Sequence, residues 1–235
     1  MAGPPADGPA FLHLVSHDLR APVAAVRTMV SLLSEGHLGV LPPPQADLLD
    51  RVERRLESLQ ALLDDLLDLA ALRASPQTGG TAALGAAARV VCAHLEERAR
   101  ASGSRLCVQE PAGALRAAIA PADLELALTH LLTNAIKYGR GGGILVRTYS
   151  EAGSARLAVS DEGIGISEAA RGRLFQPMFR AAEAEAVASG SGLGLLIVKE
   201  AVERSGGSVE IDSTEGVGTT VTLCLPPADG PSSVA

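Results

Sequence analysis

A stripe of apolar residues between positions 49 and 70 constrains the fold of this chain more than any other feature. The members of the stripe are Leu49, Val52, Leu56, Leu59, Leu63, Leu66 and Ala70. Because they alternate by three and four along the sequence, they lie on one face of an α-helix, as in helical bundles and coiled coils. Further leucines flank the stripe, so the apolar face is wider than a single partner helix requires.

A second helix with the same spacing precedes it. Its apolar positions are Leu12, Val15, Leu19, Val23, Val26, Val30 and Leu33. In the connecting segment EGHLGVLPPPQAD, two glycines and three prolines are expected to end the first helix before Asp47 opens the second. Residues 10–74 therefore form an all-α helical hairpin, and the surplus apolar surface predicts that two chains pair into a dimeric four-helix bundle.

Residues 75–81, SPQTGGT, read as a linker, after which helix and strand patterns alternate. Helices are predicted over 84–102, 121–139 and 192–207, and strands over 105–110, 114–120, 144–150, 155–161, 208–213 and 218–226. This mixture predicts a multidomain chain, with an α+β two-layer sandwich over residues 82–226 following the hairpin. Residues 1–9 and 227–235 are expected to be flexible ends.

Composition excludes several classes of function. The formal net charge of -7 argues against general nucleic-acid binding, which needs a basic surface. The three cysteines have no metal-binding spacing and are odd in number, which indicates a reducing, cytoplasmic compartment. No signal peptide and no membrane segment is expected, because the chain has neither an apolar h-region at its start nor a run of about 18 apolar residues.

The segment VSHDLRAP places His17 and Asp18 in the middle of the first helix. His17 is two residues from both Val15 and Leu19, about 200° around the helix from each, so it points away from the apolar stripe. Pro22 removes a backbone hydrogen bond to the Asp18 carbonyl and is expected to bend the helix just after the histidine. Taken alone, this is a solvent-facing His–Asp pair.

The segment HLLTNAIKYG carries Asn134, Lys137 and Tyr138 near a helix end. The amide oxygen of Asn134 can bind a hard cation, and Lys137 can meet a phosphate group. Taken alone, Asn134 reads more readily as a cap or a surface residue than as a metal ligand.

In the segment SDEGIGIS, Asp161 ends a strand and Gly163 and Gly165 follow. A carboxylate at this place can accept from an exocyclic amine, while the glycines let a flat ring approach the backbone. A site built in this way rejects the wrong base, because a mismatch leaves buried polar groups unpaired. Taken alone, the sequence DEG reads as a turn.

Two further segments complete the set. RLFQPMFR, residues 173–180, ends on Phe179 and Arg180, and could be a hydrophobic plug with an arginine that reaches a terminal phosphate. GSGLGLLIVKE, residues 190–200, leads glycines into a helix whose free amides and positive dipole end attract an anion. It is neither the dinucleotide fingerprint nor a P-loop. Its candidate residues are Gly190, Gly192, Leu193 and Gly194.

These four segments, in this order and behind a helical hairpin with a His–acid pair, resemble the sensor histidine kinases of two-component systems. SHDLRAP resembles the phosphoacceptor box, and the other four resemble the family's N, first glycine, phenylalanine and second glycine boxes. The resemblance covers residues 10–226. It implies a dimerisation and phosphotransfer domain followed by an ATP-binding domain of the Bergerat type, which is shared with DNA gyrase and MutL.

The resemblance implies roles for these residues. His17 would attack the γ-phosphate of ATP, with Asp18 accepting or stabilising the Nδ1 proton. Mg²⁺ would bind Asn134 with His130, and Asp161 would read adenine, while residues 181–191 would form a short mobile lid. The remaining ATP-binding positions are Lys137, Tyr138, Gly163, Gly165, Phe179, Arg180, Gly190, Gly192, Leu193 and Gly194. The implied partners are the receiver domain of a response regulator and a second copy of the chain. A separate sensory protein is one open alternative, since no input domain is recognised in this sequence.

Two positions depart from the family pattern. Where the family often has Thr or Asn four residues after the histidine, this chain has Ala21, which predicts weak phosphatase activity toward the regulator. Where the family has Asn four residues before Asn134, this chain has His130, which could weaken Mg²⁺ binding, act as a base for slow ATP hydrolysis, or be a tolerated substitution.

Two other functions compete with the kinase. One is an ATPase switch in which the nucleotide moves the domains and His17 is never phosphorylated. The other is a dimeric scaffold without catalysis, against which the glycines and Asp161 argue.

Overall fold

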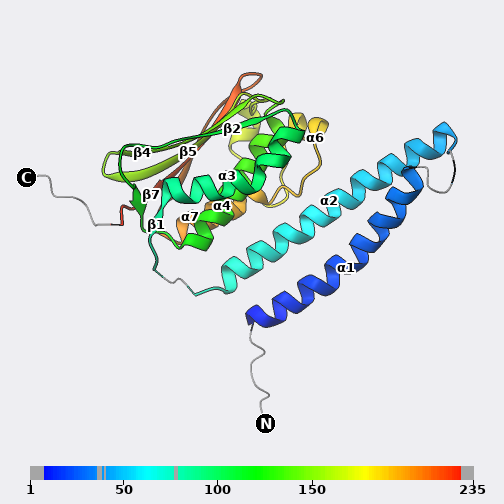
Figure 1. Ribbon diagram of the computed structural model, residues 1–235, viewed down its shortest axis with the longest axis horizontal. Coiled ribbons are helices and arrows are strands. Elements are labelled where there is room, and N and C mark those ends of the chain that lie inside the picture. The colour runs from blue at the N-terminus through cyan, green and yellow to red at the C-terminus, as the bar shows by residue number, and fades with distance from the viewer. Residues whose placement is uncertain (1–7, 36–38, 40, 77–78, 229–235) are drawn as a thin grey trace, which may run out of the picture. The chain divides into compact units, whose positions relative to one another are not determined.

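The structure is a computed structural model that describes residues 8–35, 39, 41–76 and 79–228, with side chains from residue 21 onward except at position 186. The described elements divide into two compact units. The first, here called the helical unit, is the pair of helices α1 and α2. The second, here called the sheet unit, comprises residues 79–188 and 192–228 (Figure 1).

In the helical unit, α1 (Gly8–Ser34) packs against α2 (Pro43–Ala74), as the two apolar stripes predict. Pro22 lies inside α1. The predicted start of the second helix at Asp47 is wrong by one turn, because the helix begins at Pro43. Proline is tolerated in a first helical turn, where its missing N–H has no partner to lose. Large apolar side chains remain exposed on both helices: Val26, Met29, Leu32, Leu48, Leu59 and Leu66.

The sheet unit is built on a five-stranded sheet with the order β2-β4-β5-β7-β6. Its strands are β2 (Arg105–Gln109), β4 (Gly143–Glu151), β5 (Ser154–Asp161), β6 (Ser208–Thr214) and β7 (Gly218–Leu225). Strands β2 and β4 pair in parallel, and every other neighbouring pair is antiparallel. A separate antiparallel pair joins β1 (Ala82–Ala83) to β3 (Arg116–Ala117).

Helices α3 (Leu84–Ala101), α4 (Pro121–Tyr138) and α7 (Gly194–Glu203) cover one face of this sheet (Figure 1). In β5 the alternate residues Ala155, Leu157 and Val159 point to the helices and are buried, as period-two patterning requires. The predicted α+β two-layer sandwich is confirmed.

Three local expectations differ from the structure. The strand predicted over 114–120 contains only Arg116 and Ala117, because its partner β1 is two residues long. Two short helices were not predicted, α5 (Glu168–Arg171) and α6 (Ala182–Val187). Helix α6 lies within the segment interpreted as a lid, and its sequence AEAEAV is rich in Ala and Glu, which favour helix.

Candidate functional site

The end of α4 is joined directly to the glycine loop that follows β5. The amide of Ile164 donates to the carbonyl of Tyr138 at 3.0 Å. Gly163 packs so closely that a Cβ there would lie 2.1 Å from the same carbonyl oxygen and 2.7 Å from Asp161 Oδ1. No other residue type fits at this contact without moving backbone, so two of the predicted motifs form one structure.

Asp161 is the last residue of β5, as predicted, and its side chain is half-buried at the end of the sheet. Its Oδ1 accepts from the Gly163 amide at 2.9 Å. Burial raises the pKa of this carboxyl, and backbone hydrogen bonds from Gly163 and Thr219 partly oppose that rise. A fixed, partly desolvated acceptor of this kind distinguishes a ligand amine from a ligand carbonyl.

The hairpin between β6 and β7 holds the other side of the glycine loop. Gly165 has a φ of +65°, and a Cβ on it would lie 2.0 Å from the carbonyl oxygen of Thr214. Gly216 N–H donates to the Ile164 carbonyl at 2.7 Å. Gly218 would place a Cβ 2.1 Å from the carbonyl oxygen of Asp161. The loop is therefore fixed by backbone on both sides, which holds the Asp161 carboxylate in place.

The start of α7 lies beside the polar side chains of α4. A Cβ on Gly194, the first residue of α7, would be 3.5 Å from His130 Nδ1 and 3.7 Å from Asn134 Nδ2. The amide end of a helix attracts anions, and amide and imidazole groups beside it can hold a cation or hydrogen-bond a phosphate. The structure thus brings together three of the predicted residues, from two motifs that are about 60 residues apart in sequence.

The segment before α7 is in contact with the phenylalanine motif. Gly192 has a φ of +74°, and a Cβ on it would lie 2.7 Å from the carbonyl carbon of Met178 and 2.8 Å from the Phe179 oxygen. Leu193, which follows, is buried. The Phe179 ring lies under the guanidinium of Arg173, 4.2 Å from ring centroid to Cζ, so the aromatic side chain is held in place by a cation–π contact.

Other predicted residues have different surroundings. The Arg180 Nη2 donates to the carbonyl oxygens of Ala184 and Ala188, and so spans helix α6. Lys137 is half-buried in the last turn of α4, and Gly190 lies in the segment 189–191, outside the sheet unit. His17 and Asp18 belong to α1, but their side chains are outside the described part of the chain.

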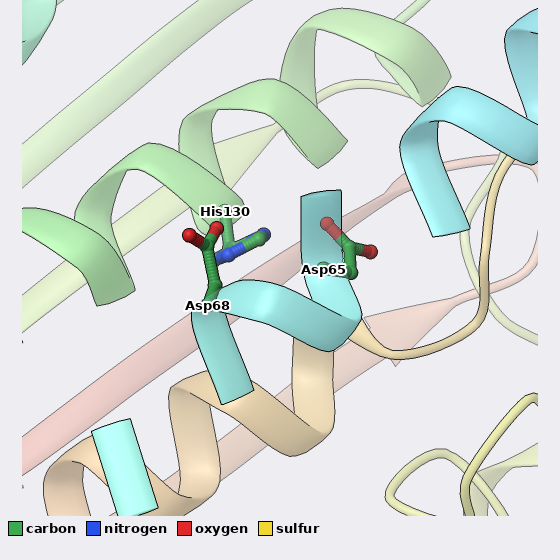
Figure 2. A group of neighbouring side chains, drawn as sticks. All are labelled: Asp65, Asp68 and His130. Carbon is green, nitrogen blue, oxygen red and sulfur yellow. The ribbon is translucent and has the colours of Figure 1, made fainter. Parts of the chain in front are cut away.

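Figure 2 shows two acidic side chains that belong to none of the predicted motifs, Asp65 and Asp68. Both stand on α2, three residues apart, so they occupy one face of that helix. His130, drawn in the same picture, is a residue of α4 in the sheet unit.

Three further side chains of the sheet unit were not predicted, namely Thr219, Ser213 and Glu183. Thr219 is the cross-strand partner of Asp161, and Ser213 is the cross-strand partner of Thr219. Glu183 of α6 accepts from the Ser167 amide at 2.9 Å, which ties α6 to the loop after β5. The TEGVG turn in the sequence indicates the hairpin, but only its register reveals which hydroxyl groups stand beside the carboxylate.

Comparison with known proteins agrees with this arrangement. Residues 10–75 match the family described as the His Kinase A (phospho-acceptor) domain. Residues 119–229 match the family described as the histidine kinase-, DNA gyrase B-, and HSP90-like ATPase. The chain belongs to the sensor histidine kinases.

Among curated histidine kinases, the circadian input-output histidine kinase CikA of Synechococcus elongatus is 33% identical over 229 residues, which are 92% of this chain and 29% of CikA. The histidine protein kinase DivJ of Caulobacter vibrioides is 31% identical over 223 residues, or 92% of this chain and 37% of DivJ. The chain thus spans about a third of the length of these two histidine kinases.

Solved histidine kinase structures have the same fold. Full-length ShkA in complex with AMPPNP has a TM-score of 0.65 at 25% identity, covering 95% of this chain and 47% of that one. The mycobacterial sensor histidine kinase MprB has a TM-score of 0.56 at 27% identity, covering 66% of this chain and 99% of that one. No helix in the described part of this histidine kinase has the length and apolarity needed to cross a membrane.

Proposed function

We propose that this chain is an ATP-dependent protein-histidine kinase that phosphorylates itself on His17 and passes the phosphoryl group to an aspartate of a response regulator. The observation that carries the proposal is the half-buried Asp161 carboxylate, held by backbone at the end of the sheet below a loop whose glycines have no space for a Cβ. Such a cradle admits a flat ring and requires a hydrogen-bond donor on it, which adenine supplies through its amine.

The residues present also fit a nucleotide's phosphates and a magnesium ion. Asn134 provides an amide oxygen, the kind of ligand that Mg²⁺ prefers, and it lies close to Gly194 at the amide end of α7. His130 lies at the same place and offers an imidazole nitrogen, a less favourable ligand for this ion. When bound there, Mg²⁺ would neutralise phosphate charge.

The chain's own residues would then perform the transfer. Nε2 of a neutral His17 forms the bond to the γ-phosphorus as the bond to the bridging oxygen breaks, and ADP leaves. The imidazole becomes cationic on attack, and Asp18 accepts or stabilises its Nδ1 proton. Most of the rate comes from positioning and charge neutralisation, which suits a site built largely from backbone.

We keep the predicted domain limits, although α1 already begins at Gly8 and Pro227 pairs with Ala117. We place the phosphotransfer hairpin at residues 10–74, the linker at 75–81 and the ATP-binding domain at 82–226. The exposed apolar side chains of α1 and α2 support pairing of two chains into a four-helix bundle. In that dimer the surplus apolar surface of each hairpin becomes buried.

Autophosphorylation is tested by incubating the full chain with Mg²⁺ and ATP labelled on the γ-phosphate. We expect an acid-labile, base-stable label that His17→Ala abolishes. His13→Ala is the matched control, because it removes another histidine of α1 one turn earlier and should leave the label intact. ATP hydrolysis without label on wild-type protein would instead identify a nucleotide-driven ATPase switch.

The phosphatase activity is expected to be weak because Ala21 cannot orient a water molecule. Ala21→Thr, which supplies a hydroxyl at that position, should speed the loss of phosphate from a phosphorylated regulator. Rapid dephosphorylation by the unaltered chain with ADP would contradict this part of the proposal.

A further inference from the structure

The hydroxyl group of Ser213 is the centre of a buried hydrogen-bond network beside Asp161. The Ser213 residue is buried, with 3% of its surface exposed. Its Oγ accepts from the Ile166 amide at 2.9 Å and donates to the Gly218 carbonyl at 2.9 Å. It also lies 2.8 Å from Thr219 Oγ1. The network therefore joins the glycine loop after β5 to the strands β6 and β7.

The direction of the bond between the two hydroxyl groups follows from counting protons. A serine hydroxyl has one proton and two acceptor positions. The Gly218 carbonyl can only accept, so it takes the Ser213 proton, and the Ile166 amide fills one acceptor position. The one assignment that satisfies all three contacts at once has Thr219 donating its own proton to Ser213. What Thr219 has left to offer a ligand is its oxygen lone pairs.

Thr219 stands next to the carboxylate that we assign to base recognition. Thr219 and Asp161 are direct partners in the antiparallel β5–β7 pair, so their side chains project from the same face about 5 Å apart. Thr219 is half-buried there. With Asp161 ionised and the Thr219 proton committed to Ser213, this end of the sheet presents only acceptors.

We propose that Ser213 is a positioning residue for base selection, which acts by holding the Thr219 hydroxyl as an acceptor beside Asp161. The inference rests on the proposed binding of adenine at Asp161. An adenine amine has two N–H donors and matches a surface of acceptors, whereas a 6-oxo purine places a carbonyl oxygen against them. Without Ser213, the Thr219 hydroxyl rotates and can donate to that carbonyl, so selection against 6-oxo purines weakens.

The test compares the affinity of the full chain for AMPPNP and for its inosine counterpart, measured by titration calorimetry with Mg²⁺. The readout is the ratio of the two dissociation constants, together with the thermal unfolding midpoint of the nucleotide-free protein. In Ser213→Ala the freed Thr219 hydroxyl can donate to the inosine carbonyl, which meets only acceptors in the wild-type protein. The dissociation constant of the inosine nucleotide divided by that of AMPPNP should therefore fall about tenfold. Ser160→Ala is the matched control, because it removes a hydroxyl hydrogen-bonded at 2.8 Å to Thr220 on the opposite face of the sheet, and should leave the ratio unchanged.

A second variant makes the test independent of whether Ser213→Ala folds. Thr219→Val removes the oriented hydroxyl and should reduce the ratio by itself. In the double variant, Ser213→Ala should cause no further change in the ratio, because both substitutions act through one hydroxyl. The inference is overturned if Thr219→Val keeps the wild-type ratio. It is also overturned if Ser213→Ala folds and binds both nucleotides more weakly at an unchanged ratio. Either result leaves the proposed function standing. If wild-type protein binds neither nucleotide, the proposed function and this inference both fail.

Discussion

Gly165 gives the sharpest test of how the glycine loop is built. Its φ of +65° lies in the left-handed region, and a Cβ on it would meet three backbone atoms of the β6–β7 hairpin. The distances are 2.0 Å to the Thr214 oxygen, 2.6 Å to the Thr214 carbon and 2.8 Å to the Glu215 Cα. Because these are backbone atoms of the last residue of β6 and the turn that follows it, they cannot rotate away as a flexible side chain could.

The expected cost of Gly165→Ala has separable parts. The left-handed conformation costs an alanine about 1–2 kcal/mol, and the lower entropy of the unfolded chain returns about 0.4–1 kcal/mol. Overpacking against fixed atoms adds about 1–3 kcal/mol. We therefore expect the free energy of unfolding to fall by about 1–5 kcal/mol, toward the lower end if the hairpin relaxes.

Gly153 supplies the matched control. It has a φ of +76° in the β4–β5 turn, and a Cβ on it would meet no heavy atom within 4 Å. Gly153→Ala therefore carries the conformational cost without the overpacking, and should lower the free energy of unfolding by only about 1 kcal/mol. The difference between the two variants isolates the steric contribution.

Tyrosine fluorescence during urea unfolding is a suitable assay. The chain has two tyrosines and no tryptophan, and both tyrosines, Tyr138 and Tyr149, belong to the sheet unit. The signal therefore reports the unit that contains the substitution. If Gly165→Ala unfolds within about 0.5 kcal/mol of Gly153→Ala, the hairpin yields to the added methyl group and the steric argument is refuted.

Three further predictions concern titratable groups. Because burial raises the pKa of Asp161, the native state binds its proton more readily than the unfolded state, and stability falls as pH rises from the ordinary to the raised pKa. Asp161→Asn should therefore raise the midpoint of urea unfolding at pH 7, and raise it less at pH 4. The same substitution should lower the affinity for adenine nucleotide about 100-fold. An unchanged affinity would refute the assignment of Asp161 to base recognition. Burial also raises the pKa of Cys92 to about 11, so in native protein a thiol reagent at pH 8 should modify the exposed Cys107 rapidly and Cys92 slowly, and Cys107→Ser should remove the fast phase. Glu183→Gln should accelerate amide exchange at Ser167, whose N–H is bound to the carboxylate; equal exchange rates would exclude that bond.

Most of the fold could be predicted because apolar periodicity depends on burial alone. The alternating pattern of β5 has a single solution in which its apolar residues face the interior. The stripe of residues 49–70 predicts the helix equally well, although Leu59 and Leu66 of that stripe are exposed in the single chain. The start of α2 was missed because the prolines at 43 and 44 look like breakers, and proline breaks a helix only beyond its first turn. The strand at 116–117 is short for a reason that lies outside its own residues, namely the length of β1.

The predicted site is only partly visible in the sequence. Neighbours within one motif, such as Asp161 and Gly163, could be paired because their separation is fixed by covalent geometry. The direction of Arg180 could not be predicted, since its guanidinium finds carbonyl groups of a helix that the motif analysis did not anticipate. Thr219 and Ser213 escaped for a different reason, because cross-strand proximity depends on register between segments distant in sequence.

Register itself ties the selectivity of the site to the packing of the core. Asp161, Thr219 and Ser213 form one cross-strand row, and each continues a column of apolar residues on its own strand. These columns end in Val159, Val221 and Ile211, which face the helices. A slip of one residue in any strand would expose its apolar column and turn its polar end residue to the opposite face at the same time. The burial that stabilises the sheet therefore also aims the three polar groups, so no separate interaction is needed to keep the carboxylate and the two hydroxyl groups on the same face.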